Sequence, residues 1–253
     1  MPGEPLVPKE WLGQVIFALA YQAAGMNGVA WLTAFVLALT FAILTYCIQA
    51  SGVPAPIAGV AGYVASIVSS IHKLARVHLL SWLAFVVCLS ILEDYRRTRD
   101  RRKLLFLAPL IVVWANMHGA FIMGLMLAAL YAVGALLEKQ WRRFGIVYRV
   151  YRHGRIVVSQ SGGRTTRVAQ PGHIVLLAAW TAFALYTARN IPLYAIVAIW
   201  MITPVAVEEL AILAPRLSRS LKQMDNVVRK TWGWHGGYWR GGVDRVERAG
   251  REL

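Results

Sequence analysis

The amino-acid sequence predicts an all-α polytopic membrane protein with about seven transmembrane helices. Of its 253 residues, 58% are hydrophobic and 15% are charged, against roughly 25% charged residues in an ordinary soluble domain. Residues 11–72 contain no Asp, Glu, Lys or Arg, and neither do residues 104–137. Because a bilayer crossing needs about 20 mostly apolar residues, these stretches together hold several crossings. They lack the alternation of an outer-membrane barrel, so helices are the expected spanning structure.

The positive charge of the chain is confined to a few places. The formal net charge is +15, and all but four of the 27 Lys and Arg residues lie in residues 93–103, 139–172 and 216–253. Basic residues in short loops are retained on the cytoplasmic side of a membrane, so we expect these segments and the C-terminus on that side. Anionic lipid headgroups are the expected counter-charge, and no nucleic-acid partner is expected.

Placing the basic segments on one side of the membrane fixes how many times the chain crosses between them. The apolar runs between basic segments must cross the bilayer an even number of times, so residues 104–138 are expected to form a helical hairpin. Residues 173–215 are expected to form a second pair, because Pro192 suits the first turn of a new helix. The expected crossings are residues 29–50, 55–71, 77–92, 104–115 and 120–138, followed by two crossings that meet at residues 189–192.

The start of the chain leaves two explanations open. Counting crossings backwards places the N-terminus outside, although residues 1–10 carry one Lys and two Glu and make a poor signal peptide. Either residues 11–25 are a short crossing, or the chain begins after a missing first transmembrane helix. Gln14, Gln22 and Gly25 favour a short interfacial helix over a span.

Two polar regions interrupt or follow the apolar runs. Within residues 139–172, the segment 145–170 has the pattern of short strands and turns, which predicts a small basic β-hairpin insertion on the cytoplasmic face. Residues 216–253 mix basic residues with Trp and Gly, which is typical of a weakly ordered anchor at headgroup level. The predicted organisation is therefore a transmembrane domain over residues 1–215 and a basic tail over residues 216–253.

The cysteines and most tryptophans are expected to be packing residues. Cys47 and Cys88 lie inside apolar runs without the spacing of metal ligands, so no metal and no cofactor is predicted. Trp82, Trp114 and Trp180 lie along the expected helices, where packing or a membrane-interface position is their usual role.

The four remaining cations gather with other polar residues at the expected outer ends of the helices. Polar side chains at membrane depth are costly and usually face a cavity or a partner, so this gathering predicts a binding site. The residues concerned are Lys9, Glu10, His72, Lys73, Arg76, His78, Asn116, His118, Arg189 and Asn190.

Such a set of side chains suits a phosphate or pyrophosphate group. Arg76 and Arg189 could hold phosphate oxygens, with Lys73 as an added charge. His78 and His118 could transfer protons near neutral pH, and Glu10 is the one carboxylate at this level. These residues could instead have structural roles. The cations could extend to the membrane interface, and His118 could form hydrogen bonds with backbone groups at a helix break. Asn116 could join two helices by a hydrogen bond.

Several segments resemble a known class of membrane enzyme. They are KEWLGQVIFALAYQAAG, GVAWLTAFVLALTFAILTY, RVHLLSWLAFVVCLSILE, PLIVVWANMHGAFIMGL and RNIPLYAIVA, which span about residues 9–204. They look like bacterial polytopic proteins similar to GT-C type glycosyltransferases, the class that includes the polyprenyl-phosphate-sugar dependent mannosyltransferases. The most specific pieces are Trp114, Asn116, His118 and Gly119, together with residues 189–192.

The resemblance implies transfer of a sugar from a polyprenyl-phosphate donor at the outer face, in a cavity between helices. Together with the polar residues at that level, it gives the hypothesis that Glu10 and His118 are catalytic. The same hypothesis assigns substrate binding to Lys73, Arg76, His78, Asn116, Arg189 and Asn190. In that class the acidic base lies in the loop after the first transmembrane helix, which this chain is expected to lack. The alternative is a non-catalytic membrane subunit or assembly factor that docks a membrane-protein partner or anionic lipid through its basic loops and tail. A transporter is the third class, since no helix interior carries a charged relay.

Overall fold

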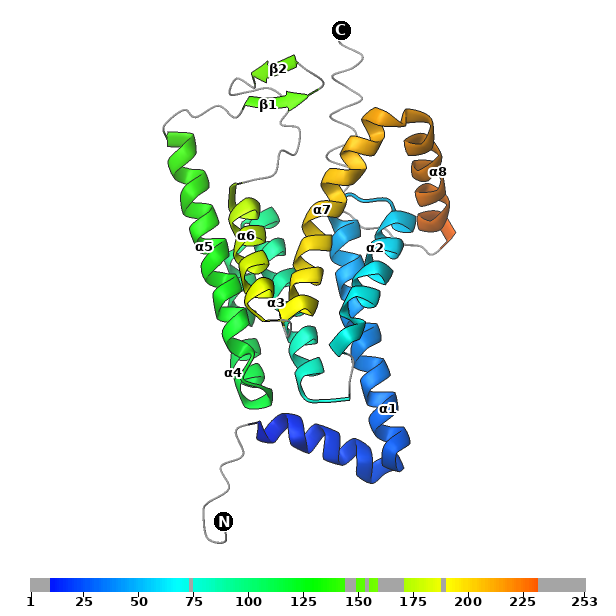
Figure 1. The fold of residues 1–253 in the computed structure, drawn as a ribbon, viewed down its shortest axis with the longest axis vertical. Helices are drawn as coiled ribbons and strands as arrows, with labels where there is room; N and C mark the ends of the chain where they lie inside the picture. The colour runs from blue at the N-terminus through cyan, green and yellow to red at the C-terminus, as the bar shows by residue number, and fades with distance from the viewer. Residues whose placement is uncertain are drawn as a thin grey trace.

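The computed structural model describes residues 10–72, 75–143, 149–152, 155–158, 171–187 and 190–231. This part of the chain is a helical bundle, as the sequence predicts (Figure 1). The α-helices are α1 (Trp11–Ala50), α2 (Ala55–Val68), α3 (His78–Thr98), α4 (Leu107–Met117), α5 (Phe121–Arg143), α6 (Pro171–Tyr186), α7 (Ile191–Leu213) and α8 (Pro215–Thr231). Two short 3-10 helices, η1 (Ser69–His72) and η2 (Arg101–Phe106), precede α3 and α4.

Two four-residue strands follow α5 within the basic insertion. Strands β1 (Arg149–Arg152) and β2 (Arg155–Val158) pair antiparallel, with Arg149 opposite Val158. The rest of the insertion, residues 144–148, 153–154 and 159–170, lies outside the described residues.

Helix α1 bends sharply at Ala24 and Gly25, about a third of the way along its length. Ala24 and Gly25 leave helical geometry, and Gly25 has φ 58° and ψ −143°, a region that glycine enters at no steric cost. The bend falls at the end of the segment that the sequence set apart as residues 11–25. It directs the first arm of α1, which begins at Trp11, across the lower end of the bundle, while the second arm runs upwards beside α2 (Figure 1).

Helix α3 lies at the centre of the packed core. It packs against α1, α4, α5 and α7, and its Phe85 is fully buried in an edge-on contact with Trp180, whose ring centre is 5.1 Å away. Trp114 is also fully buried and donates from Nε1 to the Ser81 hydroxyl at 3.0 Å. Gly124 makes room for the Trp114 ring, because a Cβ there would lie 2.6 Å from it. The packing roles predicted for the tryptophans and for both buried cysteines are confirmed.

Three helices are long and apolar enough to cross a bilayer among the described residues. They are Trp11–Ala50, His78–Thr98 and Ile191–Ala211. The apolar helices Ala55–Val68, Phe121–Leu137 and Val175–Tyr186 are shorter, at 10–17 residues, and α4 has 11 residues. The structure thus supports a membrane protein, whereas the figure of seven crossings remains a proposal.

The last helix differs from the expected weakly ordered tail. Residues 215–231 form α8, which packs against α7 and α2. The carboxylate Oδ1 of Asp225 accepts a hydrogen bond of 2.8 Å from the backbone N–H of Ala55, at the first turn of α2. A carboxylate at a helix N-terminus satisfies an unpaired donor and is attracted by the helix dipole. This contact fixes α8 on the bundle; residues 232–253 lie outside the described part of the chain.

Candidate functional site

The first arm of α1 brings the start of the described chain to the turn between α4 and α5. Gly13 is buried against α3 and α4: a Cβ at this position would clash with Val77 and lie 2.6 Å from the carbonyl oxygen of Met117. Only a residue without a side chain allows this approach. The arm therefore sits close enough for Glu10 and Trp11 to reach the predicted site residues of the α4–α5 turn.

Glu10 and His118 form the acidic and basic pair of this site. The Glu10 carboxylate lies 3.5 Å from His118 Nε2, and the two side chains are 34% and 20% exposed. His118 ends α4 in an extended conformation, and its Nδ1 accepts a hydrogen bond of 3.1 Å from the backbone N–H of Ala120. Since Nδ1 is an acceptor, neutral His118 carries its proton on Nε2, which faces Glu10.

Asn116 joins α4 to the first arm of α1. A hydrogen bond between two helices was one of the roles that the sequence left open for this residue. Its Oδ1 accepts a hydrogen bond of 2.9 Å from Trp11 Nε1, and its Nδ2 donates to the carbonyl of Val112 at 2.8 Å. Trp11, which sequence reasoning did not select, is thus part of the site. The amide of Asn116 positions the first arm of α1 over His118.

Arg76 and His78 precede and begin α3 near the same turn. Arg76 is exposed, and the backbone carbonyl of Arg76 accepts from Leu79 N at 3.1 Å, which starts the helix. His78 is half-buried, with its ring edge-on to Trp82 at a centre distance of 5.8 Å. The neighbouring Val77 contacts the Gly13 position, so the start of α3 and the first arm of α1 meet here. Lys73 lies outside the described residues.

Asn190, a predicted substrate-binding residue, is buried beside the end of α6. It is 7% exposed, and its side-chain amide donates to the carbonyl of Phe183 at 3.1 Å. That carbonyl belongs to the last turn of α6, where backbone carbonyl groups have no following helical N–H to bond. In Figure 1 the end of α6 and the start of α7 lie farther up the bundle than the α4–α5 turn. Asn190 therefore closes the end of α6, and Arg189 beside it lies outside the described residues.

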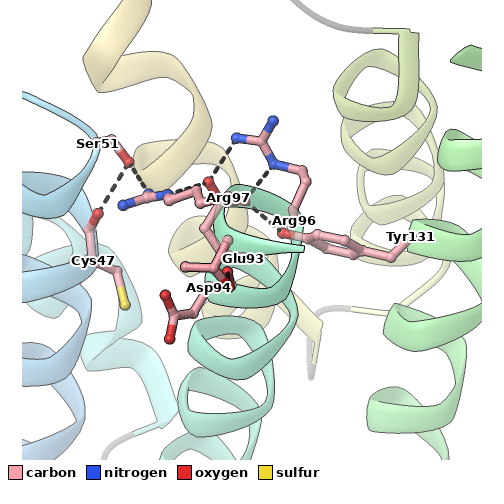
Figure 2. Close-up of polar contacts among 8 residues, drawn as sticks. Cys47, Ser51, Glu93, Asp94, Arg96, Arg97 and Tyr131 are labelled. Carbon is pink, nitrogen blue, oxygen red and sulfur yellow. Dashed lines mark hydrogen bonds and ion pairs between the residues drawn. The ribbon is translucent and has the colours of Figure 1, made fainter. Parts of the chain in front are cut away.

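A second polar cluster, which sequence reasoning missed, lies at the opposite end of α3 (Figure 2). Glu93 is 3% exposed, and its carboxylate accepts hydrogen bonds of 2.7 to 2.8 Å from Arg96 and Arg97. Arg97 also donates to the Ser51 hydroxyl at 2.7 Å, and Ser51 donates to the carbonyl of Cys47 at 3.0 Å.

This basic-end cluster, formed by Glu93, Arg96, Arg97 and Ser51, ties the end of α1 to α3. The hydroxyl of Tyr131 on α5 lies 3.5 Å from Glu93, at the limit of a hydrogen bond. Buried carboxylates are stable only when paired, and here two guanidinium groups with side chains 29% and 25% exposed supply the charge. The spacing of Glu93 from Arg96 and Arg97, three and four residues, was the available sequence signal.

A groove of about 460 Å³ lies between α1 and α2. Its lining includes Phe41, Thr45, Gln49 and Tyr63, and Gly62 allows the two helices to approach at Thr45. The predicted site residues do not line this groove, so it is separate from the Glu10–His118 pair. Its open, largely apolar wall is typical of a surface that faces lipid.

Comparison of the chain with protein-family models, with curated proteins and with solved structures gives no match.

Proposed function

We propose that the protein transfers a sugar from a polyprenyl-phosphate donor at the outer membrane face, as a glycosyltransferase of GT-C type. The observation that supports this proposal is the contact between Glu10 and His118, 3.5 Å apart at the end of the bundle where Arg76 and Asn116 also lie. A carboxylate and an imidazole side by side, both partly exposed, can accept and pass on a proton.

The proposed step is a displacement with inversion. The acceptor hydroxyl gives its proton to the Glu10 carboxylate, and its oxygen forms a bond to the anomeric carbon of the sugar. The bond between that carbon and the phosphate oxygen breaks, and the electron pair leaves with the polyprenyl phosphate. His118 Nε2–H, 3.5 Å from the Glu10 carboxylate, would hold the carboxylate in place.

The cations have the task of binding the leaving phosphate. Exposed Arg76 would form paired hydrogen bonds with phosphate oxygens and stabilise the charge that grows as the sugar departs. Lys73 and Arg189 are proposed as further phosphate ligands, and His78 as a donor to the sugar. Asn116 keeps Trp11 and the first arm of α1 over the turn, so its proposed contribution is positioning.

The proposal includes the membrane arrangement. Seven helices, from the second arm of α1 to α7, would cross a bacterial cytoplasmic membrane, with the first arm of α1 at the outer interface. The basic segments, the strands β1 and β2 and the C-terminus would face the cytoplasm.

Reconstitution of the full chain with a radiolabelled polyprenyl-phosphate sugar tests the proposal. Glu10→Gln is expected to lower transfer by about 10²-fold or more while donor binding persists, and Arg76→Gln is expected to weaken donor binding. Glu209→Gln, at an exposed carboxylate on α7, is the matched control and should leave both unchanged. A native chain that neither transfers the sugar nor binds the donor would contradict the enzyme hypothesis.

A non-catalytic membrane subunit or assembly factor is the second candidate. The observation that favours it is the basic-end cluster, whose buried carboxylate and short hydrogen bonds make a more closely packed polar assembly than the Glu10–His118 pair. Removal of residues 216–253 separates the candidates. Loss of a co-purifying membrane protein with the helical core intact supports the subunit, whereas an enzyme keeps its affinity for the donor.

A further inference from the structure

Helix α8 presents two kinds of side chain on its outer surface. Its sequence, PRLSRSLKQMDNVVRKT, contains five cations and one acidic residue. Arg216, Arg219, Lys222 and Lys230 are exposed. Leu217, Met224 and Val227 are also exposed, by 50%, 53% and 63% of their surface. Large apolar side chains exposed beside a row of cations need an explanation in a helix that is docked on a folded bundle.

The rotation of α8 is set by its single carboxylate. Asp225 faces inwards because it accepts the hydrogen bond from Ala55 N at the start of α2. At about 100° per residue, Arg216, Arg219 and Lys230 lie on the side opposite Asp225, and Met224 and Leu217 lie along one flank. The contact therefore turns these cations away from the bundle and keeps the apolar flank outside.

This arrangement is the one that an interfacial helix needs. Apolar side chains enter the boundary between headgroups and acyl chains, while cations on the adjoining face pair with lipid phosphates. We infer that α8 is a docking helix for an anionic phospholipid surface, with Leu217, Met224 and Val227 as its apolar contacts. Charge complementarity selects this occupant, since five cations against one inward carboxylate suit a negative surface and the apolar flank suits lipid.

The inference goes beyond the proposed sugar transfer and does not depend on it. Lipid bound by α8 would act at the basic end of the bundle, at the turn between α1 and α2, through the contact of Asp225 with Ala55. Lipid binding by α8 would give the protein a preference for anionic membranes. The proposed phosphate site near Arg76, at the other end of the bundle, does not provide this preference.

The experiment uses the full chain in lipid nanodiscs, with an environment-sensitive fluorophore at Met224→Cys and, in a matched chain, at Asn226→Cys. The native cysteines Cys47 and Cys88 are buried. In discs that contain phosphatidylglycerol, we expect the fluorophore at position 224 to be severalfold better protected from an aqueous quencher than in phosphatidylcholine discs. Position 226, which lies about 160° around the helix, is expected to show little difference.

Substitution of four cations by Gln should abolish the difference in protection between the two lipids; the residues are Arg216, Arg219, Lys222 and Lys230. Each cation is expected to contribute about fivefold to the affinity for the anionic lipid. High salt should also reduce the difference between the two lipids in the unsubstituted chain. This measurement tests the inference even if the variant with four substitutions does not fold. Equal exposure of position 224 in both lipids would overturn the inference. Equal protection in both lipids would also overturn it, because burial of position 224 would then not depend on anionic lipid.

Discussion

Replacing Glu93 by Gln tests how much the basic-end cluster contributes to stability. The substitution keeps the shape of the side chain and removes the charge that both guanidinium groups of Arg96 and Arg97 share. A hydrogen bond to a charged group contributes about 1.5–3 kcal/mol, and removal of one partner of a fully buried pair costs about 3–5 kcal/mol.

The magnitude follows from the exposure of the partners. The carboxylate is 4% exposed, but the arginine side chains are 29% and 25% exposed and can regain part of their hydration. Gln can still accept one of the hydrogen bonds. We therefore expect a loss of about 2 kcal/mol, below the value for a fully buried pair.

Thermal unfolding in detergent measures this loss. For a chain of this size, about 2 kcal/mol corresponds to a fall in midpoint of about 4–8 °C. Glu209→Gln is the control for loss of an exposed carboxylate, and Tyr131→Phe should have a small effect because its hydroxyl is 3.5 Å from Glu93. An unchanged midpoint for Glu93→Gln would refute the reasoning that this buried charge is held by its arginine partners.

Three further substitutions follow from the packing. Gly13→Ala should displace the first arm of α1 and speed hydrogen exchange in residues 11–23, whereas Gly59→Ala, with open space around it, should not; equal exchange in both would contradict the close contact. Trp114→Phe should lower stability by about 2–3 kcal/mol through the lost hydrogen bond and a cavity, measured by thermal unfolding. Asp225→Asn should cost about 0.5–1 kcal/mol and speed hydrogen exchange in α8, and slow exchange there would argue against its role at the α2 terminus.

The sequence predicted the helices well because the physical signals are local. The Gly and Pro residues of the α1–α2 turn and Pro192 at the start of α7 mark element ends within a residue or two. Helices α3 and α5 continue past the predicted ends at residues 92 and 138, to Thr98 and Arg143, because a helix can extend beyond its charge-free run. Helix α8 also had a local signal, the apolar positions Leu217, Leu221 and Met224 on one face, but the basic and Trp-rich composition of the whole tail outweighed it.

The contacts that build the sites could not be predicted in the same way. Trp11 and Asn116 are 105 residues apart, and Ala55 and Asp225 are 170 apart, so only the packed fold brings them together. In the sequence, Glu93 stands at the start of the basic segment 93–103, where nothing distinguishes it from an exposed loop carboxylate. Its burial depends on two arginine side chains that fold back along α3 and on a serine from another helix.

The central claim is that the Glu10–His118 end of the bundle faces outside and the basic end faces the cytoplasm. Labelling of intact cells with a membrane-impermeant maleimide tests it, using Gly119→Cys at the α4–α5 turn and Arg101→Cys beside the basic-end cluster, both at exposed positions. The proposed arrangement predicts labelling at position 119 in intact cells and at position 101 only after the membrane is opened. Labelling at position 101 in intact cells, with position 119 protected, would contradict it.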